Sequence, residues 1–200
     1  ASSSKFIAMS KEKSDLSKYK DKRDFKSTKE PEGKKRKRSK NRFSFQKHDA
    51  SNLHYDFRLE YDGVLKSWAI PKGPSTDPSV KRLAVRTEDH PVDYLDFEGT
   101  IPENEYGAGT VLLWDEGTYE NITEKDGKLR DIGESLEKGH LLIRLSGKKI
   151  KGGYALTRMD KERGQWLFVK MDDEEADARR NTTSTEPESV KSGKKLDEID

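Results

Sequence analysis

The sequence predicts a mainly β protein, a compact antiparallel β-barrel or sandwich with one or two short helices and disordered termini. Only 30% of its 200 residues are hydrophobic and 39% are charged, but the apolar residues gather between positions 43 and 170. That stretch is long enough to bury a core of its own. Within it, short runs of β-branched and aromatic residues are bounded by Gly, Pro, Asp or Asn, a spacing typical of barrels and sandwiches.

Eight such runs are expected to form strands. They cover residues 43–45, 53–60, 64–70, 83–87, 111–114, 141–145, 154–158 and 166–170. Asp62-Gly63 separates the second run from the third and predicts a hairpin turn. The one convincing helical window is 126–139, where Gly139 is a plausible stop, while 11–23 has a thin apolar face and allows at most a short helix.

Composition divides the chain into three parts. We expect a flexible tail over 1–18, a single domain over 19–175 that includes a basic segment at 34–42, and a disordered polar, acidic tail over 176–200. Residues 1–42 carry sixteen Lys and Arg against six Asp and Glu, whereas residues 171–200 carry five against ten. A basic arm suggests a polyanionic partner such as nucleic acid, although the run 34–40 is equally consistent with a solvated linker.

Several classes of protein are disfavoured. The absence of cysteine excludes disulfides and thiolate metal sites. The sequence shows no signal-peptide core and no apolar run of the roughly 20 residues that span a bilayer, so we expect a cytoplasmic protein without a membrane partner.

A candidate metal site lies in the segment from His48 to Arg58. Strand alternation puts His54, Asp56 and Arg58 on one face, opposite an apolar face, and a turn after His48 would bring the first imidazole back beside the second. Two imidazoles and a carboxylate with open positions suit Mn²⁺, Fe²⁺ or Zn²⁺. The alternative without a metal site is that these side chains form the solvated face of an ordinary strand.

Two further segments carry candidate residues. Arg82 lies in a predicted strand that ends at His90-Pro91, and this histidine is either structural or serves in catalysis or phosphate binding. Lys72 sits in a turn stiffened by prolines and glycine, which limits the entropy lost on meeting an anion, but an ordinary exposed turn explains it as well. The Gly-rich segment 103–109 lacks the Gly-Lys-Ser/Thr ending of a nucleotide-binding loop, so no nucleoside triphosphate is assigned to it.

Together these segments resemble the 3′-phosphoesterase module of bacterial DNA ligase D. The resemblance runs over about residues 19–175. The motifs that carry it, in order, are Lys22-Arg-Asp-Phe25, His48-Asp-Ala-Ser-Asn-Leu-His-Tyr-Asp-Phe-Arg58, Trp68-Ala-Ile-Pro-Lys-Gly-Pro74, Glu88-Asp-His-Pro-Val-Asp-Tyr94 and Asp96-Phe-Glu-Gly-Thr-Ile-Pro102. With no room for ligase or polymerase modules, a stand-alone relative is expected.

The resemblance implies a hydrolase that heals the 3′ ends of DNA during non-homologous end joining. Such an enzyme would use Mn²⁺, with Co²⁺ or Zn²⁺ as alternatives, to remove a 3′-terminal ribonucleoside or 3′-phosphate from a primer-template. By the same resemblance, the metal ligands are His48, His54 and Asp56, and the catalytic residues are Arg23, Asp24, Glu30, Arg58, Lys72, Arg82, His90 and Tyr94.

The expected partners are primer-template or RNA–DNA 3′ ends, together with a separate DNA ligase, polymerase or end-binding repair protein, and the chain is expected to act as a monomer. Two alternatives remain open. One is a non-catalytic module that binds DNA ends and recruits repair partners. The other is a structural metal site, which usually takes all four ligands from the protein.

Overall fold

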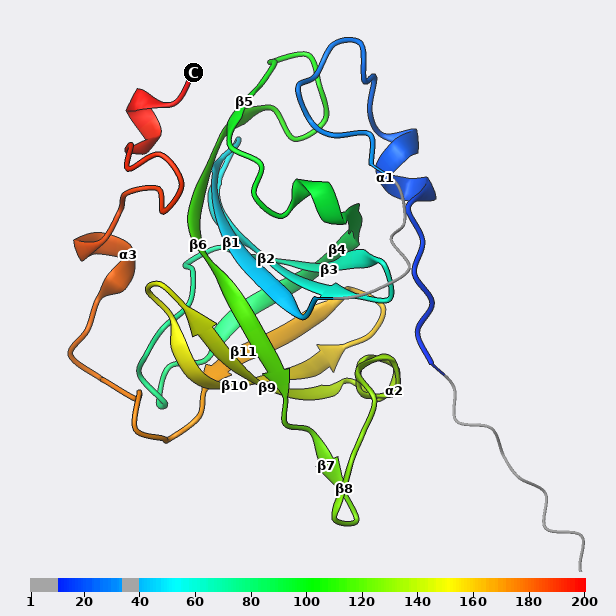
Figure 1. Ribbon diagram of the computed structural model, residues 1–200, viewed down its shortest axis with the longest axis vertical. Helices are drawn as coiled ribbons and strands as arrows, with labels where there is room; N and C mark the ends of the chain where they lie inside the picture. The colour runs from blue at the N-terminus through cyan, green and yellow to red at the C-terminus, as the bar shows by residue number, and fades with distance from the viewer. Residues whose placement is uncertain (1–10, 34–39) are drawn as a thin grey trace, which may run out of the picture.

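A computed structural model describes residues 11–33 and 40–200 of the chain and shows a closed antiparallel barrel (Figure 1). Eight strands make the barrel, in the order β1-β2-β3-β4-β11-β10-β9-β6, and pairing between β1 and β6 closes it. These strands are β1 (Arg42–Asp49), β2 (Leu53–Tyr61), β3 (Val64–Ile70), β4 (Arg82–Pro91), β6 (Gly109–Asn121), β9 (His140–Gly147), β10 (Lys151–Asp160) and β11 (Gln165–Lys170). Each contains one of the eight predicted runs, so the mainly β prediction is confirmed.

Short helices and strands lie outside the eight strands of the barrel. They are α1 (Ser17–Asp21), η1 (Val92–Tyr94), β5 (Gly99–Ile101), β7 (Glu124–Lys125), β8 (Lys128–Leu129), α2 (Ile132–Lys138), α3 (Thr182–Thr185) and η2 (Leu196–Glu198). β5 pairs with the first part of β6, and β7 pairs with β8 in a separate hairpin. None of the helices in the described ranges has the length and apolar content that crossing a bilayer requires.

The barrel interior holds an aromatic core. Alternation along β1 and β2 turns Phe45 and Phe57 inward, where their rings stack at 4.7 Å between centroids. Phe57 also lies 5.1 Å from Phe168 of β11, on the far side of the strand order. The same alternation turns the intervening polar residues of β1 and β2 outward.

The hairpin predicted between β2 and β3 is present. Asp62 and Gly63 have φ values of +48° and +80°, the paired positive angles that a two-residue turn of the favoured hairpin type requires. Tyr61 then pairs with Val64, so the turn sets the register of both strands.

The outer face of β1–β3 is covered rather than solvated. Residues 11–33 and η1 lie over it, and Tyr19, Leu65, Tyr94 and Leu95 form a second apolar cluster there (Figure 1). Because this cover excludes water, polar side chains on the outer face are buried: Arg58 is 3% exposed. The face that the sequence presents as a polar surface is therefore an interior.

Within the predicted flexible tail over 1–18, the structure describes residues 11–18. Residues 11–18 are docked on β3 and β4, since Glu12 pairs with Arg86 and, at 3.1 Å, with Lys66, and the Asp15 amide donates to Asp89 at 2.9 Å. The sequence pattern misses this docking because its partners are distant in the chain. Residues 1–10, and most of the basic run at 34–40, lie outside the described residues.

The helix expected over 126–139 is shorter than predicted. Asp126 and Gly127 have φ values of +54° and +74° and form the β7–β8 turn instead. α2 begins after Asp131, whose carboxylate accepts from the Gly133 amide as an N-cap, and it ends at Gly139 with φ +76°. The predicted stop is confirmed, and the start moves to the first residue with a capping side chain.

The structure lays the segment 176–200, predicted as a disordered polar, acidic tail, along the barrel. The Trp114 indole donates to the Glu186 carbonyl at 2.8 Å, and the Val190 amide donates to the Leu113 carbonyl at 2.9 Å. Leu196 and Ile199 pack against the main core. Composition shows little apolar content in this tail, but it does not show that the barrel offers unpaired donors and acceptors to it.

Candidate active site

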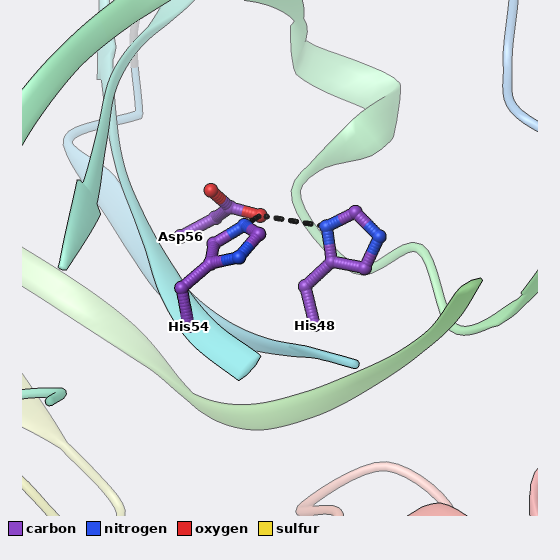
Figure 2. A group of neighbouring side chains, drawn as sticks. All are labelled: His48, His54 and Asp56. Carbon is purple, nitrogen blue, oxygen red and sulfur yellow. Dashed lines mark hydrogen bonds and ion pairs between the residues drawn. The ribbon is translucent and has the colours of Figure 1, made fainter. Parts of the chain in front are cut away.

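The hairpin of β1 and β2 brings three candidate metal ligands together (Figure 2). His48 and His54 are direct cross-strand partners, so both imidazoles project from the same outer face with ring centroids 4.8 Å apart. Asp56 follows His54 by two residues and therefore shares that face. A nitrogen or oxygen from each lies within 4.8 Å of the others.

The ligand atoms are oriented by backbone carbonyls. His48 Nε2 lies 2.7 Å from the Gly107 carbonyl, which leaves Nδ1 facing Asp56 Oδ2 at 3.4 Å. His54 Nδ1 lies 3.0 Å from the Asn52 carbonyl, which leaves Nε2 facing the same oxygen at 3.2 Å. If each carbonyl takes the ring N–H, both nitrogens that face the carboxylate are acceptors, as metal ligands must be. The donor set fits a divalent cation.

The charges in this group favour an ionised carboxylate. Burial raises the pKa of Asp56, but hydrogen bonds from the protonated forms of His48 and His54 and the nearby Arg58 charge outweigh it and hold that pKa well below the usual range. Burial lowers the pKa of His54, but the bond with Asp56 leaves it raised overall. The carboxylate is thus available to a cation throughout the neutral pH range.

Arg58 is fixed beside the three ligands. Its Nε donates to Gln46 Oε1 at 2.6 Å and its Nη1 donates to Ser67 Oγ at 2.8 Å. The remaining Nη2 lies 3.7 Å from Asp56 Oδ2, and the guanidinium carbon sits 4.8 Å from the centre of the Tyr94 ring. One edge of a rigid cation therefore faces the candidate metal position.

Arg23 reaches the same place from the N-terminal arm. Its Nε pairs with Glu30 at 2.8 Å and its Nη1 with Glu88 at 3.5 Å, and its guanidinium carbon lies 4.0 Å from the centre of the Tyr19 ring. The side chain is only 4% exposed. A segment distant in sequence thus supplies a second buried cation.

His90 is a neutral imidazole in this setting. Burial, followed by the charges of Arg58 and Arg23, lowers its pKa well below the ordinary value. Nδ1 lies 2.9 Å from the Glu88 carbonyl, and Nε2 faces Arg23 Nη2 at 3.5 Å. With Nδ1–H donated to the carbonyl, Nε2 is a proton acceptor.

These side chains line one pocket of about 360 Å³, a size suited to a small ligand or the end of a chain. Of the predicted site residues, the pocket wall includes His48, His54, Asp56, Arg58, Arg23, His90 and Tyr94. A larger hollow of about 690 Å³ lies between the β9–β10 hairpin and residues 173–175, but it contains no histidine. The candidate metal ligands and the two buried arginines therefore lie in the smaller pocket.

The other four predicted residues lie off the pocket wall. Glu30 stands behind Arg23, and the Asp24 carboxylate accepts from the Lys26 amide at 3.1 Å within the turn of the arm. Lys72 is exposed in the turn after β3, and Arg82 lies on β4 opposite Phe168.

Among the pocket residues that the sequence does not single out, three contact the predicted site residues or the arm. Glu88 pairs with both arm cations, Gly107 orients His48, and Tyr106 lies on the pocket wall beside it. Glu88 stands two residues before His90, which is the one signal that points to it. The Gly-rich segment around Tyr106 lacks a nucleotide-binding motif and carries no other sequence signal that points to this residue.

The fold and the site define a closed β-barrel with a candidate divalent-metal centre, flanked by two buried arginines and a neutral histidine. The family model described as "DNA Ligase D 3'-phosphoesterase domain" matches residues 46–158, more than half of the chain. The chain belongs to this family, a hydrolase family of phosphoesterases.

Three relatives extend the comparison. The "Multifunctional non-homologous end joining protein LigD" of Pseudomonas aeruginosa PAO1 is 50% identical over 188 residues, which are 90% of this chain and 22% of that protein. The protein of the same name from Mycolicibacterium smegmatis is 42% identical over 162 residues, 80% of this chain and 21% of its own length. The "Multifunctional non-homologous end joining DNA repair protein LigD" of Mycobacterium tuberculosis H37Rv is 47% identical over 131 residues, 66% of this chain and 16% of its own. The chain spans about a fifth of the length of the first two relatives.

Proposed function

We propose that this protein is a metal-dependent phosphoesterase that heals 3′ ends of DNA: it removes a 3′-terminal ribonucleoside to leave a 3′-phosphate, and it hydrolyses a 3′-phosphate to leave a ligatable 3′-hydroxyl. The observation that carries the proposal is the pocket itself. Three ligands for a divalent cation and two buried guanidinium groups meet within it. That combination suits a phosphate ester, whose charge needs compensation on several oxygens at once.

The cation would be Mn²⁺, with Co²⁺ or Zn²⁺ as alternatives. Held by His48, His54 and Asp56, such an ion supplies Lewis-acid chemistry at a phosphoryl oxygen and lowers the pKa of bound water. Two imidazoles and one carboxylate leave coordination positions open, as catalytic sites need.

The chain's own residues would position the phosphate. Arg58 presents a free guanidinium edge, and Arg23 approaches from the arm, so the two can hold oxygens that the cation does not. Both are already buried and fixed, so little reorganisation accompanies the rise of charge in the transition state.

His90 would act as a proton acceptor. Its neutral Nε2 can take a proton from the attacking group, either water or, in the ribonucleoside step, a 2′-hydroxyl adjacent to the scissile phosphate. After receiving that proton, the imidazolium can pass it to the leaving oxygen. Tyr94, 4.9 Å from the His90 ring between centroids, fixes the imidazole plane.

The residues off the pocket wall would serve indirectly. Asp24 and Glu30 shape the arm that carries Arg23. Lys72 lies three positions after Ala69, a residue of the pocket wall, and Arg82 is the first residue of β4. We therefore assign both side chains to DNA phosphates beyond the reacting one. In this proposal the protein works as a monomer alongside a DNA ligase, polymerase or end-binding repair protein.

The test is a gel assay on a 5′-labelled primer that ends in a 3′-phosphate or a single ribonucleotide, annealed to a longer template. Conversion to the 3′-hydroxyl is expected with Mn²⁺ and the wild-type protein. It should fail in EDTA and with His54→Ala, and it should persist with His140→Ala, whose imidazole lies on β9 away from the pocket. Tight binding of the same duplex without conversion under any divalent metal would instead identify a non-catalytic end-binding module.

A further inference from the structure

Tyr106 is an exposed aromatic at the wall of the metal pocket. Half of its surface is open to solvent, and among the described residues it is the one aromatic in the group of exposed large hydrophobic side chains. Leaving an aromatic ring in water forgoes favourable burial, so this position calls for an explanation.

The backbone around Tyr106 is tied directly to the metal ligands. The next residue, Gly107, accepts from the His48 ring at 2.7 Å, and a Cβ added there would lie 3.7 Å from His48 Cε1. Gly109 follows at φ +133°, and a Cβ there would stand 2.1 Å from the Asp49 carbonyl oxygen. The backbone on the C-terminal side of Tyr106 is thus held against β1, which places this residue beside the candidate metal ligands.

The arm supplies cations to the same ring. Lys22 Nζ lies 4.6 Å from the ring centre and 3.3 Å from the hydroxyl, while the Arg23 guanidinium carbon lies 5.4 Å from the ring centre. Lys22 also pairs with Glu88 at 3.2 Å, which fixes the ammonium at the pocket wall. An aromatic ring bordered by cations combines the two features that bind nucleotides, a stacking surface and charge for phosphate.

We propose that Tyr106 is the stacking platform for the terminal nucleobase of the strand whose 3′ end enters the metal pocket. The inference rests on the proposed function, because it needs a nucleic-acid end at the metal ligands. A terminal phosphate held there leaves its nucleoside outside, and the rigid loop places an aromatic face at that boundary. Every base has a π-face, so Tyr106 would favour a base-bearing end without selecting its sequence.

The experiment compares two primers that differ only at the 3′-terminal nucleotide. Both end in a 3′-phosphate, but one carries a normal base and the other a tetrahydrofuran abasic residue. kcat/KM is measured with Mn²⁺ for wild-type, Tyr106→Ala, Tyr106→Phe and Leu129→Ala, the last changing an exposed apolar residue on the β7–β8 hairpin. A 2-aminopurine at the terminal position reports stacking in the bound complex by fluorescence quenching.

Wild type should prefer the base-bearing end by at least about 5-fold, the low end of what one stacked base contributes. Tyr106→Ala should remove that preference through a higher KM and restore the fluorescence. Tyr106→Phe keeps the ring and loses the hydroxyl contact with Lys22, so it should retain the preference for the base-bearing primer and the fluorescence quenching. Leu129→Ala should retain them as well.

Two results would overturn the inference. Equal losses on both primers with Tyr106→Ala would show that the ring only supports the loop that orients His48. Equal turnover of both primers by wild type would show that no stacking occurs. Failure of wild type to turn over either primer would overturn the proposed function itself and is therefore distinguishable from both.

Discussion

Arg23 and Glu30 form a buried ion pair within the N-terminal arm, with 2.8 Å between Nε and Oε2 and side-chain exposures of 4% and 0%. Both residues come from the same short segment, which lies over the outer face of the barrel. The arm thus holds this ion pair against the barrel, and the pair places the Arg23 guanidinium at the wall of the pocket that contains the candidate metal ligands.

The ion pair predicts a positioning role for Glu30. Glu30→Gln should lower kcat/KM by about 10- to 100-fold, because the guanidinium loses its main anchor while Glu88 still holds it at longer range. Metal affinity, measured by calorimetry, should stay unchanged. Glu32→Gln, two residues along the arm and exposed, is the matched control. An equal loss from both variants would point to the net charge of the arm rather than to the pair.

The arrangement of the three candidate ligands predicts that changing the carboxylate between the two imidazoles weakens metal binding. Asp56→Asn should weaken Mn²⁺ binding by at least about 100-fold, because it replaces the anionic ligand that both imidazoles face. Near-UV circular dichroism should confirm that the barrel persists. His140→Ala should bind metal like wild type. Undiminished Mn²⁺ affinity in the Asp56→Asn protein would place the metal elsewhere.

Docking of residues 11–18 should depend on pH. Burial raises the pKa of Glu12, but its bonds and charge interactions with Arg86 and Lys66 leave it lowered from the usual 4.5. A group whose folded-state pKa is lowered stabilises the folded form above its unfolded pKa and loses that contribution as the pH falls through the folded value. Protection of the docked amides should therefore decline below about pH 4.5.

Hydrogen exchange, corrected for intrinsic rates, measures this protection. The Asp15 amide, which bonds to Asp89, is a suitable reporter. Glu12→Gln should show weakened protection at neutral pH and a smaller change on acidification. A pH profile identical to that of wild type would assign the acid sensitivity to Asp89 or another carboxylate.

The tail contact predicts a measurable role for one indole N–H. Trp114→Phe removes the bond to the Glu186 carbonyl, whereas Trp68→Phe removes an indole N–H that has no partner among the described residues. Both changes shrink a buried side chain. Because only Trp114→Phe also loses a hydrogen bond, its free energy of unfolding should fall by a further ~0.5–1.5 kcal/mol. Denaturant titration gives this difference, and protease cleavage within 176–200 should accelerate in Trp114→Phe alone. Equal cleavage in both variants would show that other contacts hold the tail.

Much of the barrel could be predicted because its signals are local. Alternation along β2, the Asp62-Gly63 turn and the C-cap at Gly139 each depend on a few neighbouring residues, and the structure has all three. The proximity of His48 and His54 could be predicted in the same way, because a short turn between two strands brings their ends together.

The contacts of the two terminal segments have a different physical origin. Composition predicts free tails because it counts apolar residues, but the 11–18 segment makes ion pairs with the barrel and the 176–200 segment makes hydrogen bonds with it. The partners of both lie many residues away. Such contacts exist only after the barrel has closed, so no local window of sequence contains them.

The sequence by itself determined the β architecture, the strand faces and the choice of two imidazoles and a carboxylate as candidate metal ligands, because each follows from side-chain chemistry and a two-residue period. Only the tertiary structure decided that this polar face is an enclosed pocket, that Arg23 enters it from the arm, and that Gly107 and Tyr106 border it. These features depend on which distant segments cover the outer face of β1–β3, and the closed barrel defines that face.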